Sequence, residues 1–115
     1  MTPEALRDLV IEALEELKGR DIATLAVSDV TDITDFMIIA TGTSNRHVKS
    51  LVDEVVEHCK SHGCQPRGIE GRENNEWVLV DIGDVIVHVM QAESRSFYDL
   101  ERLWTEIPTD SETLV

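Results

Sequence analysis

The stretch EWVLVDIGDVIVHVM, residues 76–90, decides how this chain folds. Two apolar runs, 76–82 and 85–91, flank Gly83 and Asp84, a pair that suits the two-residue turn of a β-hairpin. With these two residues as the turn, every cross-strand pair is fixed, and successive pairs point to opposite faces of the sheet. One face then carries only aliphatic side chains and is expected to be core: Val78, Val80, Ile82, Val85, Val87 and Val89.

The other face of this hairpin is chemically mixed. It carries three cross-strand pairs: Asp81 with Ile86, Leu79 with His88, and Trp77 with Met90. Such a face is too apolar to remain fully hydrated and too polar for a deep core. Two interpretations stay open. A helix or loop of the chain covers the face, as is usual in α/β sheets, or the face binds another protein, because Trp and Met are enriched at interface centres.

The remaining elements, read outward from the hairpin, give the order α-β-β-α-β-β-β-α. Thr2 and Pro3 predict the start of a first helix, which Gly19 can close. A second helix is expected from the Ser44 cap to a left-handed Gly63, and a last helix over about 94–103. Strands are expected over 21–27, 34–41 and 65–70, and the continuous apolar run 34–41 predicts a central strand covered on both faces. The pattern therefore predicts an α/β domain with a mixed sheet and helices on its faces.

The composition is typical of a globular cytoplasmic protein. The 115 residues are 42% hydrophobic, which fits one domain with its own core. Two cysteines are too few for a disulfide framework and suit a reducing cytoplasm. We expect no signal peptide, and no apolar run approaches the about 20 residues that a bilayer requires. The domain is expected over residues 1–107, followed by an acidic, loosely ordered tail over 108–115.

The charge favours some partners over others. Twenty-three acidic residues against ten basic ones give a net charge of −13. A phosphate backbone would repel such a chain, so little or no direct nucleic-acid binding is expected. A basic partner would attract it. Because acidic surfaces also serve solubility alone, the charge by itself does not identify a partner.

The turn TGTSNRHVKS, residues 41–50, resembles a phosphate-binding turn that leads into a helix N-terminus. A nucleotide there would contact Gly42, Thr43, Ser44 and Arg46. Nucleotidyl transfer also needs paired carboxylates for two metal ions, and the corresponding residues 53–55 fall inside the second helix. Local structure explains the turn without a ligand: Gly42 permits an unusual backbone angle and Ser44 caps the helix.

Two further groups of side chains are of types that can carry chemistry. Arg46 and the neighbouring histidine at position 47 oppose the helix dipole, which points either to a functional role or to ion pairs with Asp32 or Asp35, and the ion pairs are favoured. A zinc site made of residues 58, 59, 62 and 64 is disfavoured, because Cys59 belongs to the buried stripe of its helix and Cys64 lies beyond the glycine cap. We therefore expect one core cysteine, two surface histidines, no metal, no cofactor and no enzyme activity.

Three blocks of the sequence resemble the Iojap-related ribosomal silencing factors, and most of all their proteobacterial members. The blocks are DITDFMIIATGTSNRHVKS, EWVLVDIGDVIVHVM and ESRSFYDLERLW, and the match runs from about residue 6 to residue 104. The resemblance implies a compact α/β domain with a mixed five-stranded sheet. It also implies a distant relation to nucleotidyltransferases, without their active site.

The same resemblance implies a function. Family members repress translation by binding the large ribosomal subunit through its protein L-fourteen, which blocks joining of the small subunit during starvation or slow growth, and they are often homodimers when free. The partner-binding role is carried onto six residues of the second and third blocks: Trp77, Leu79, Asp81, His88, Arg95 and Tyr98. Packing against the last helix is the alternative for the Trp and the Tyr. A degenerate nucleotide-binding enzyme and a dimeric adaptor with another partner remain rival functions.

Overall fold

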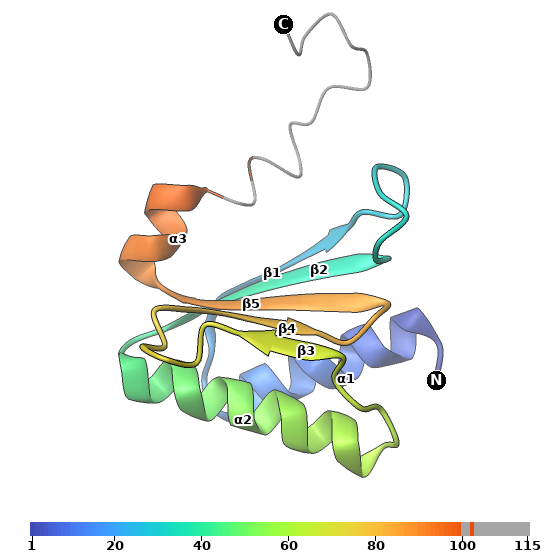
Figure 1. The fold of residues 1–115 in the computed structure, drawn as a ribbon, viewed down its shortest axis with the longest axis horizontal. Helices are drawn as coiled ribbons and strands as arrows, with labels where there is room; N and C mark the ends of the chain where they lie inside the picture. Colours follow the sequence, from blue (N-terminus) through green and yellow to red (C-terminus); the bar gives the residue numbers. More distant parts are fainter. Residues whose placement is uncertain (100–101, 103–115) are drawn as a thin grey trace, which may run out of the picture.

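The structure, a computed structural model, describes residues 1–99 and residue 102. Its five strands form one mixed sheet in the order β1-β2-β5-β4-β3 (Figure 1). Strands β2 and β5 are parallel, and the other neighbouring pairs are antiparallel. The predicted α/β domain with a mixed five-stranded sheet is confirmed. The elements are α1 (Pro3–Glu16), β1 (Arg20–Ala26), β2 (Phe36–Gly42), α2 (Asn45–Ser61), β3 (Gly68–Glu70), β4 (Trp77–Asp81), β5 (Val85–Gln91) and α3 (Ala92–Tyr98).

The β4–β5 hairpin has the register that the sequence predicts. Trp77 pairs with Met90 and Leu79 with His88, so the mixed face forms as expected. The Ile82 amide donates to the Val85 carbonyl at 3.0 Å across the turn. Gly83 has a φ of +88°, and Asp84 is not among the residues with positive φ. A positive φ at the first turn residue alone is the pattern of a type II′ turn, which matches the twist of the strands.

Helices α1 and α2 lie side by side on one face of the sheet (Figure 1). Their apolar stripes cover the aliphatic face of the hairpin, and this layer is the main core of the domain. Burial of this apolar surface is the chief force that holds the two layers together. The largest side chains buried there are Leu14, Ile38, Leu51, Val10, Val48, Val52, Val55, Val78 and Val80.

Helix α3 packs on the opposite face, against β5 and β2 (Figure 1). A second, smaller apolar cluster lies on that face, formed by Val27, Met37, Ile39 and Met90. Both faces of β2 are therefore buried, as its continuous apolar sequence predicts. Helix α3 begins two residues before the predicted start, and Asp99 after it is left-handed. The predicted continuation of this helix to about 103, the domain limit at 107 and the tail over 108–115 lie outside the described residues.

The helix ends confirm three predictions and correct one. The Thr2 and Ser44 hydroxyls accept hydrogen bonds from the third residue after each, and Gly63 is left-handed with a φ of +78°. Gly19, in contrast, is not the left-handed residue at the end of α1. Lys18 takes that conformation, with a φ of 60°, and the Gly19 amide donates to the Leu14 carbonyl at 2.8 Å. The end is a Schellman motif displaced by one residue from the glycine.

Gly42 is needed for a reason other than the one the sequence suggests. Its φ is not positive, so no unusual backbone angle is present. A Cβ atom at Gly42 would instead lie 2.6 Å from Cγ2 of Val48 and 3.0 Å from the Val48 amide nitrogen. The first turn of α2 passes so close to the end of β2 that only glycine fits without displacement.

Candidate protein-binding face

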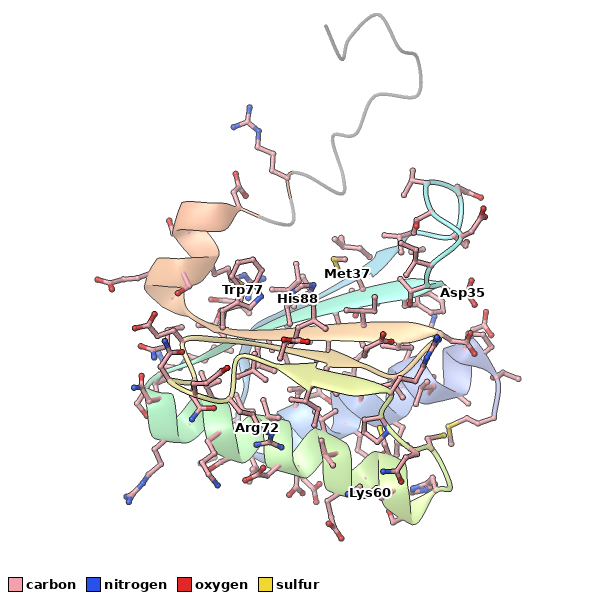
Figure 2. The ribbon with its side chains drawn as sticks, in the orientation of Figure 1. Asp35, Met37, Lys60, Arg72, Trp77 and His88 are labelled. Carbon is pink, nitrogen blue, oxygen red and sulfur yellow. The ribbon has the colours of Figure 1, made fainter. Side chains whose placement is uncertain are left out.

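The candidate site is the sheet face that points away from α1 and α2, here called the mixed face. Strand register brings side chains of four strands onto it. Figure 2 shows three of them, Met37, Trp77 and His88, on the side opposite the two long helices. The face is formed by Leu25 of β1, Met37, Ile39 and Thr41 of β2, Ile86, His88 and Met90 of β5, and Trp77, Leu79 and Asp81 of β4.

Trp77 and His88 form a bonded pair near the middle of this face. The indole Nε1–H donates to Nδ1 of His88 at 2.9 Å, and the two ring centroids are 5.8 Å apart. His88 is only 5% exposed, and burial lowers its pKa to about 4. The imidazole is therefore neutral at physiological pH and carries its proton on Nε2, because Nδ1 is the acceptor. The pair is an aromatic group among the aliphatic and polar side chains of this face.

Asp81 and Leu79 are half-buried on the same strand, but their side chains make different contacts. The Asp81 carboxylate accepts the Gly83 amide at 2.9 Å, so it stabilises the hairpin turn as well as placing a negative charge at the edge of the mixed face. Leu79 lies between His88 on β5 and Glu70 on β3. Its side chain can make only apolar contacts, which makes it a clean probe of this surface.

Arg95 and Tyr98 belong to α3, which stands at one end of the mixed face. The Arg95 guanidinium donates from Nη1 to Oγ1 of Thr41 at 2.8 Å and so ties α3 to β2. The Tyr98 side chain lies outside the described part of the molecule. Among the six predicted residues, four thus lie on the sheet face, and the arginine connects the helix to that face.

Sequence reasoning missed the contribution of β1 and β2 to the mixed face. Leu25, Met37 and Ile39 lie there because β2 pairs in parallel with β5, and no local pattern indicates that pairing. The only available signal was the continuous apolar run of β2, which requires a second buried face but does not say which strand lies beside it.

The turn at residues 41–50 is fastened to α1. His47 accepts the Thr43 amide at Nδ1, at 2.9 Å, and donates from Nε2 to the Leu17 carbonyl at 2.8 Å. The prediction that His47 pairs with Asp32 or Asp35 is therefore wrong. Arg46 is exposed and makes no ion pair with any described residue either, so its predicted pairing is also wrong.

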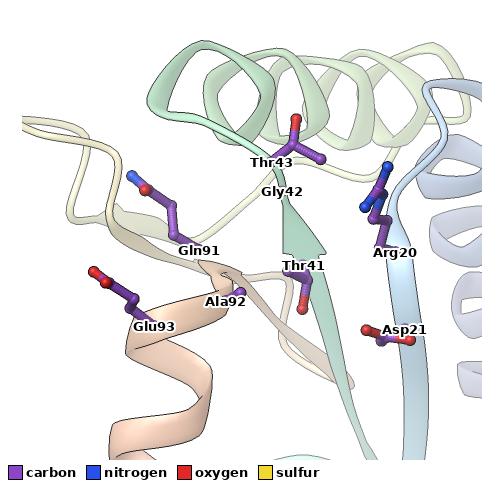
Figure 3. A pocket seen from close by; sticks show the side chains of 8 residues that line it. All are labelled: Arg20, Asp21, Thr41, Gly42, Thr43, Gln91, Ala92 and Glu93. Atoms are coloured by element: carbon purple, nitrogen blue, oxygen red, sulfur yellow. The ribbon is translucent and has the colours of Figure 1, made fainter.

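A cleft of about 390 Å³ lies beside this turn, at the carboxyl ends of β2 and β5 (Figure 3). Its charged side chains are one guanidinium, of Arg20, and two carboxylates, of Asp21 and Glu93. Two carboxylates against one cation repel a triphosphate. Ser44 and Arg46, which the nucleotide hypothesis requires, are not among its lining residues. The geometry therefore does not favour nucleotide binding.

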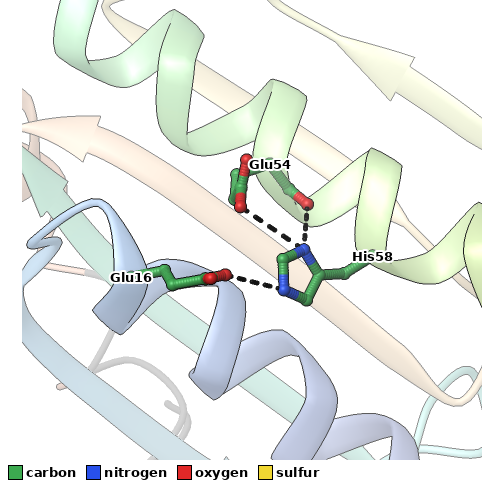
Figure 4. A group of neighbouring side chains, drawn as sticks. All are labelled: Glu16, Glu54 and His58. Atoms are coloured by element: carbon green, nitrogen blue, oxygen red, sulfur yellow. Dashed lines mark hydrogen bonds and ion pairs between the residues drawn. The ribbon is translucent and has the colours of Figure 1, made fainter.

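One trio of possible metal ligands occurs within the described part of the chain: Glu16, Glu54 and His58 (Figure 4). Nε2 of His58 lies 2.8 Å from Oε2 of Glu16, and Nδ1 lies 3.0 Å from the backbone carbonyl of Glu54. Both ring nitrogens already lie against oxygen atoms, and the contact between His58 and Glu16 joins the end of α1 to α2. The prediction of a surface histidine at this position is thus only partly right, because the ring is half-buried.

The other residues of the disfavoured zinc site are dispersed. Cys59 lies in the core, where burial, with a smaller contribution from Cys64, raises its pKa to about 11. Cys64 is half-buried beside Met1, and His62 is exposed. The prediction of one core cysteine is confirmed.

Fold and surface together define a small α/β domain whose second sheet face combines aromatic, aliphatic and polar side chains. No helix in the described part of the chain is long and apolar enough to span a membrane. The model of the family "Ribosomal silencing factor during starvation", RsfS, matches residues 1–114. The chain belongs to this family, whose members are ribosome-associated regulators of translation.

Individual relatives agree with this assignment. A ribosomal silencing factor of Chromobacterium violaceum is 49% identical over 104 residues, which cover 90% of this chain and 85% of the relative. A crystal structure of a protein from the same organism superposes with a TM-score of 0.90 at 46% identity, covering 96% of this chain and 92% of that one. A mouse protein named for mitochondrial assembly of the ribosomal large subunit is 35% identical over 101 residues, which are 85% of this chain and 44% of the mouse protein.

Proposed function

We propose that this protein represses translation by binding the large ribosomal subunit through its protein L-fourteen and blocking the small subunit from joining. The observation that carries the proposal is the mixed face, where Trp77, Leu79 and Ile86 offer apolar contacts beside the charge of Asp81. Within the described residues, α3 is the only helix that packs on this face, and it leaves Trp77, Leu79 and Ile86 half-buried, whereas the longer α1 and α2 cover the other face. Family membership supplies the ribosomal partner.

The charge of the chain supports a protein partner within the ribosome. At −13, the chain is repelled by rRNA and attracted to basic ribosomal proteins. Electrostatic attraction of this kind accelerates the encounter, and the apolar centre of the face then supplies most of the affinity. Direct contact with nucleic acid is therefore expected to be small.

The proposed mechanism is steric and needs neither chemistry nor a cofactor. A standard protein interface buries about 800 Å² on each partner. A domain seated by such an interface on the joining surface of the large subunit excludes the small subunit by volume alone. We place this action in the cytoplasm of starved or slowly growing cells. The free protein would form a homodimer.

Six residues are proposed to contact the partner: Trp77, Leu79, Asp81, His88, Arg95 and Tyr98. His88 acts mainly by holding Trp77, since it is almost fully buried. Asp81 and Arg95 also hold the hairpin turn and α3 in place. Of the six, Leu79 is thus the residue whose substitution tests the surface with the least effect on the fold.

The test is co-sedimentation of the purified protein with purified large subunits. Leu79→Lys replaces an apolar contact by an ammonium that repels a basic partner, and we expect at least about tenfold weaker binding. Glu57→Gln changes the net charge by the same amount on the exposed side of α2 and is the matched control. Binding of Leu79→Lys that equals binding of the control would contradict the assignment of the face.

A charge probe separates electrostatics from turn structure. Asp81→Asn keeps an oxygen that can accept the Gly83 amide but removes the negative charge. We expect slower association and a weaker dependence of binding on salt, with the unfolding midpoint unchanged. An unchanged salt dependence would show that Asp81 does not face a basic surface.

A further inference from the structure

The segment SDVTDITD, residues 28–35, joins β1 to β2 and is here called the acidic loop. Its base is closed by the Val27 amide, which donates to the Asp35 carbonyl at 3.0 Å. The Val27 carbonyl accepts the amides of both Val30 and Thr31, each at 3.0 Å, and Oγ1 of Thr31 accepts the Ile33 amide at 3.2 Å. These bonds hold the base and the first turn of the loop.

The acidic loop presents two apolar side chains to solvent. Ile33 is 73% exposed and Val30 is 43% exposed. Isolated exposed hydrophobic residues are common and need no explanation. Here, however, the two residues lie three positions apart on one hydrogen-bonded loop. Val27, at the base of this loop, belongs to the second apolar cluster.

The charges around these two residues are unneutralised. Asp29, Asp32 and Asp35 make no ion pair with any residue that the structure describes. The loop therefore combines exposed apolar side chains with three available carboxylates. A surface that complements it must be apolar at its centre and positively charged around that centre.

The position of the loop relates it to the mixed face. It rises from the sheet on the same side as α3, away from α1 and α2 (Figure 1). Because β2 and β5 are parallel, the loop stands at the end where both strands begin, and α3 stands at the end where β5 finishes. The Asp35 amide also donates to the Asp84 carbonyl at 3.0 Å, which fixes the base of the loop to the hairpin.

We infer that the acidic loop is a second contact element for the partner that binds the mixed face, with Ile33 inserted into an apolar site on a basic protein. The inference rests on the proposed function and extends its binding surface from the sheet to the loop. A second copy of this chain is the less favoured occupant of the loop, because its net charge of −13 supplies no basic rim for the three carboxylates; the proposed homodimer would then form through another surface. Nucleic acid is a poor occupant for the same reason.

The hydrogen bonds within the loop affect the binding energetics. A contact made by a hydrogen-bonded loop loses less loop entropy on binding than one made by an unstructured segment, so more of its apolar burial contributes to affinity. Removal of such a contact acts mainly on the dissociation rate. Removal of the carboxylates acts mainly on the association rate and on its dependence on salt.

The test measures affinity and kinetics for purified large subunits with the full chain. Ile33→Ser is expected to weaken binding by about tenfold through faster dissociation, the size of effect seen for a central interface residue. Its thermal unfolding midpoint should stay unchanged, because the side chain is exposed. Leu17→Ser, at an exposed leucine at the end of α1, is the matched control and should bind as the wild type does. The double variant Asp29→Asn/Asp32→Asn should associate more slowly at low salt.

The outcomes distinguish this inference from the proposed function. If Leu79→Lys abolishes binding and Ile33→Ser binds as the wild type does, the loop inference is overturned and the mixed face stands. If neither variant weakens binding, both are overturned. If Ile33→Ser changes only the mass of the free protein and not its ribosome binding, the loop contacts a second copy and the inference is again overturned. Weakened binding by both variants, with Leu17→Ser unchanged, supports it.

Discussion

The hydrogen bond between Trp77 and His88 gives a prediction whose size follows from the structure. Trp77→Phe keeps an aromatic ring but removes the indole N–H, so Nδ1 of a 95% buried imidazole loses its donor. A buried acceptor without a partner costs about 1–3 kcal/mol. With a urea m-value of about 2 kcal/mol/M, the unfolding midpoint should fall by about 0.5–1.5 M. Circular dichroism follows the transition without depending on the substituted indole.

The second half of a double-mutant cycle makes this prediction refutable. His88→Leu removes the buried acceptor, so Trp77→Phe made in that background has no hydrogen bond left to break. The loss in free energy of unfolding of the double variant Trp77→Phe/His88→Leu should therefore be smaller, by about 1–2 kcal/mol, than the sum of the losses in the two single variants. If the two effects simply add, the hydrogen bond contributes nothing and the interpretation of His88 as the holder of Trp77 is refuted.

Three further predictions concern single features of the fold. Burial lowers the pKa of His88 to about 4, so the unfolded state binds the proton first as pH falls, and stability should decrease between about pH 6.5 and pH 4. The free energy of unfolding, measured in urea, should therefore fall between pH 7 and pH 5 by about 2 kcal/mol more in the wild type than in His88→Leu. Gly42→Ala forces a Cβ against Val48 and should cost about 1–3 kcal/mol in thermal unfolding, whereas Gly68→Ala, which meets no atom within 4 Å, should cost almost nothing. Iodoacetamide at pH 8 should label Cys64 in the native protein and Cys59 only after denaturation, because burial raises the pKa of the Cys59 thiol to about 11; native labelling of both thiols would contradict that burial.

The parts of the fold that local chemistry controls could be predicted from the sequence. The Gly83-Asp84 turn fixed the register of β4 and β5, and the hydroxyls of Thr2 and Ser44 fixed two helix starts. Predictions failed where a distant neighbour decides the outcome. Gly42 is required by the approach of Val48, and the ring of His47 is bonded to a carbonyl thirty positions earlier in the chain.

In the candidate site, too, residues placed by local sequence could be predicted, and residues placed by distant strand pairing could not. Trp77, Leu79, Asp81 and His88 could be assigned to one face, because period-two alternation along the hairpin is a local property. Met37 and Leu25 could not, because their place depends on the parallel pairing of β2 with β5. The exposure of Ile33 was also hidden, since an isoleucine is by default expected inside the protein.

The central claim, that the protein blocks subunit joining by occupying the large subunit, is tested most directly by light scattering with purified subunits. Large subunits are first incubated with the wild-type chain or with Leu79→Lys, and small subunits are then added. The account predicts that the wild-type chain lowers the amplitude of joining in proportion to its occupancy, and that Leu79→Lys leaves joining almost unchanged at the same concentration. Joining at full amplitude with large subunits that are saturated with the wild-type chain would contradict the account.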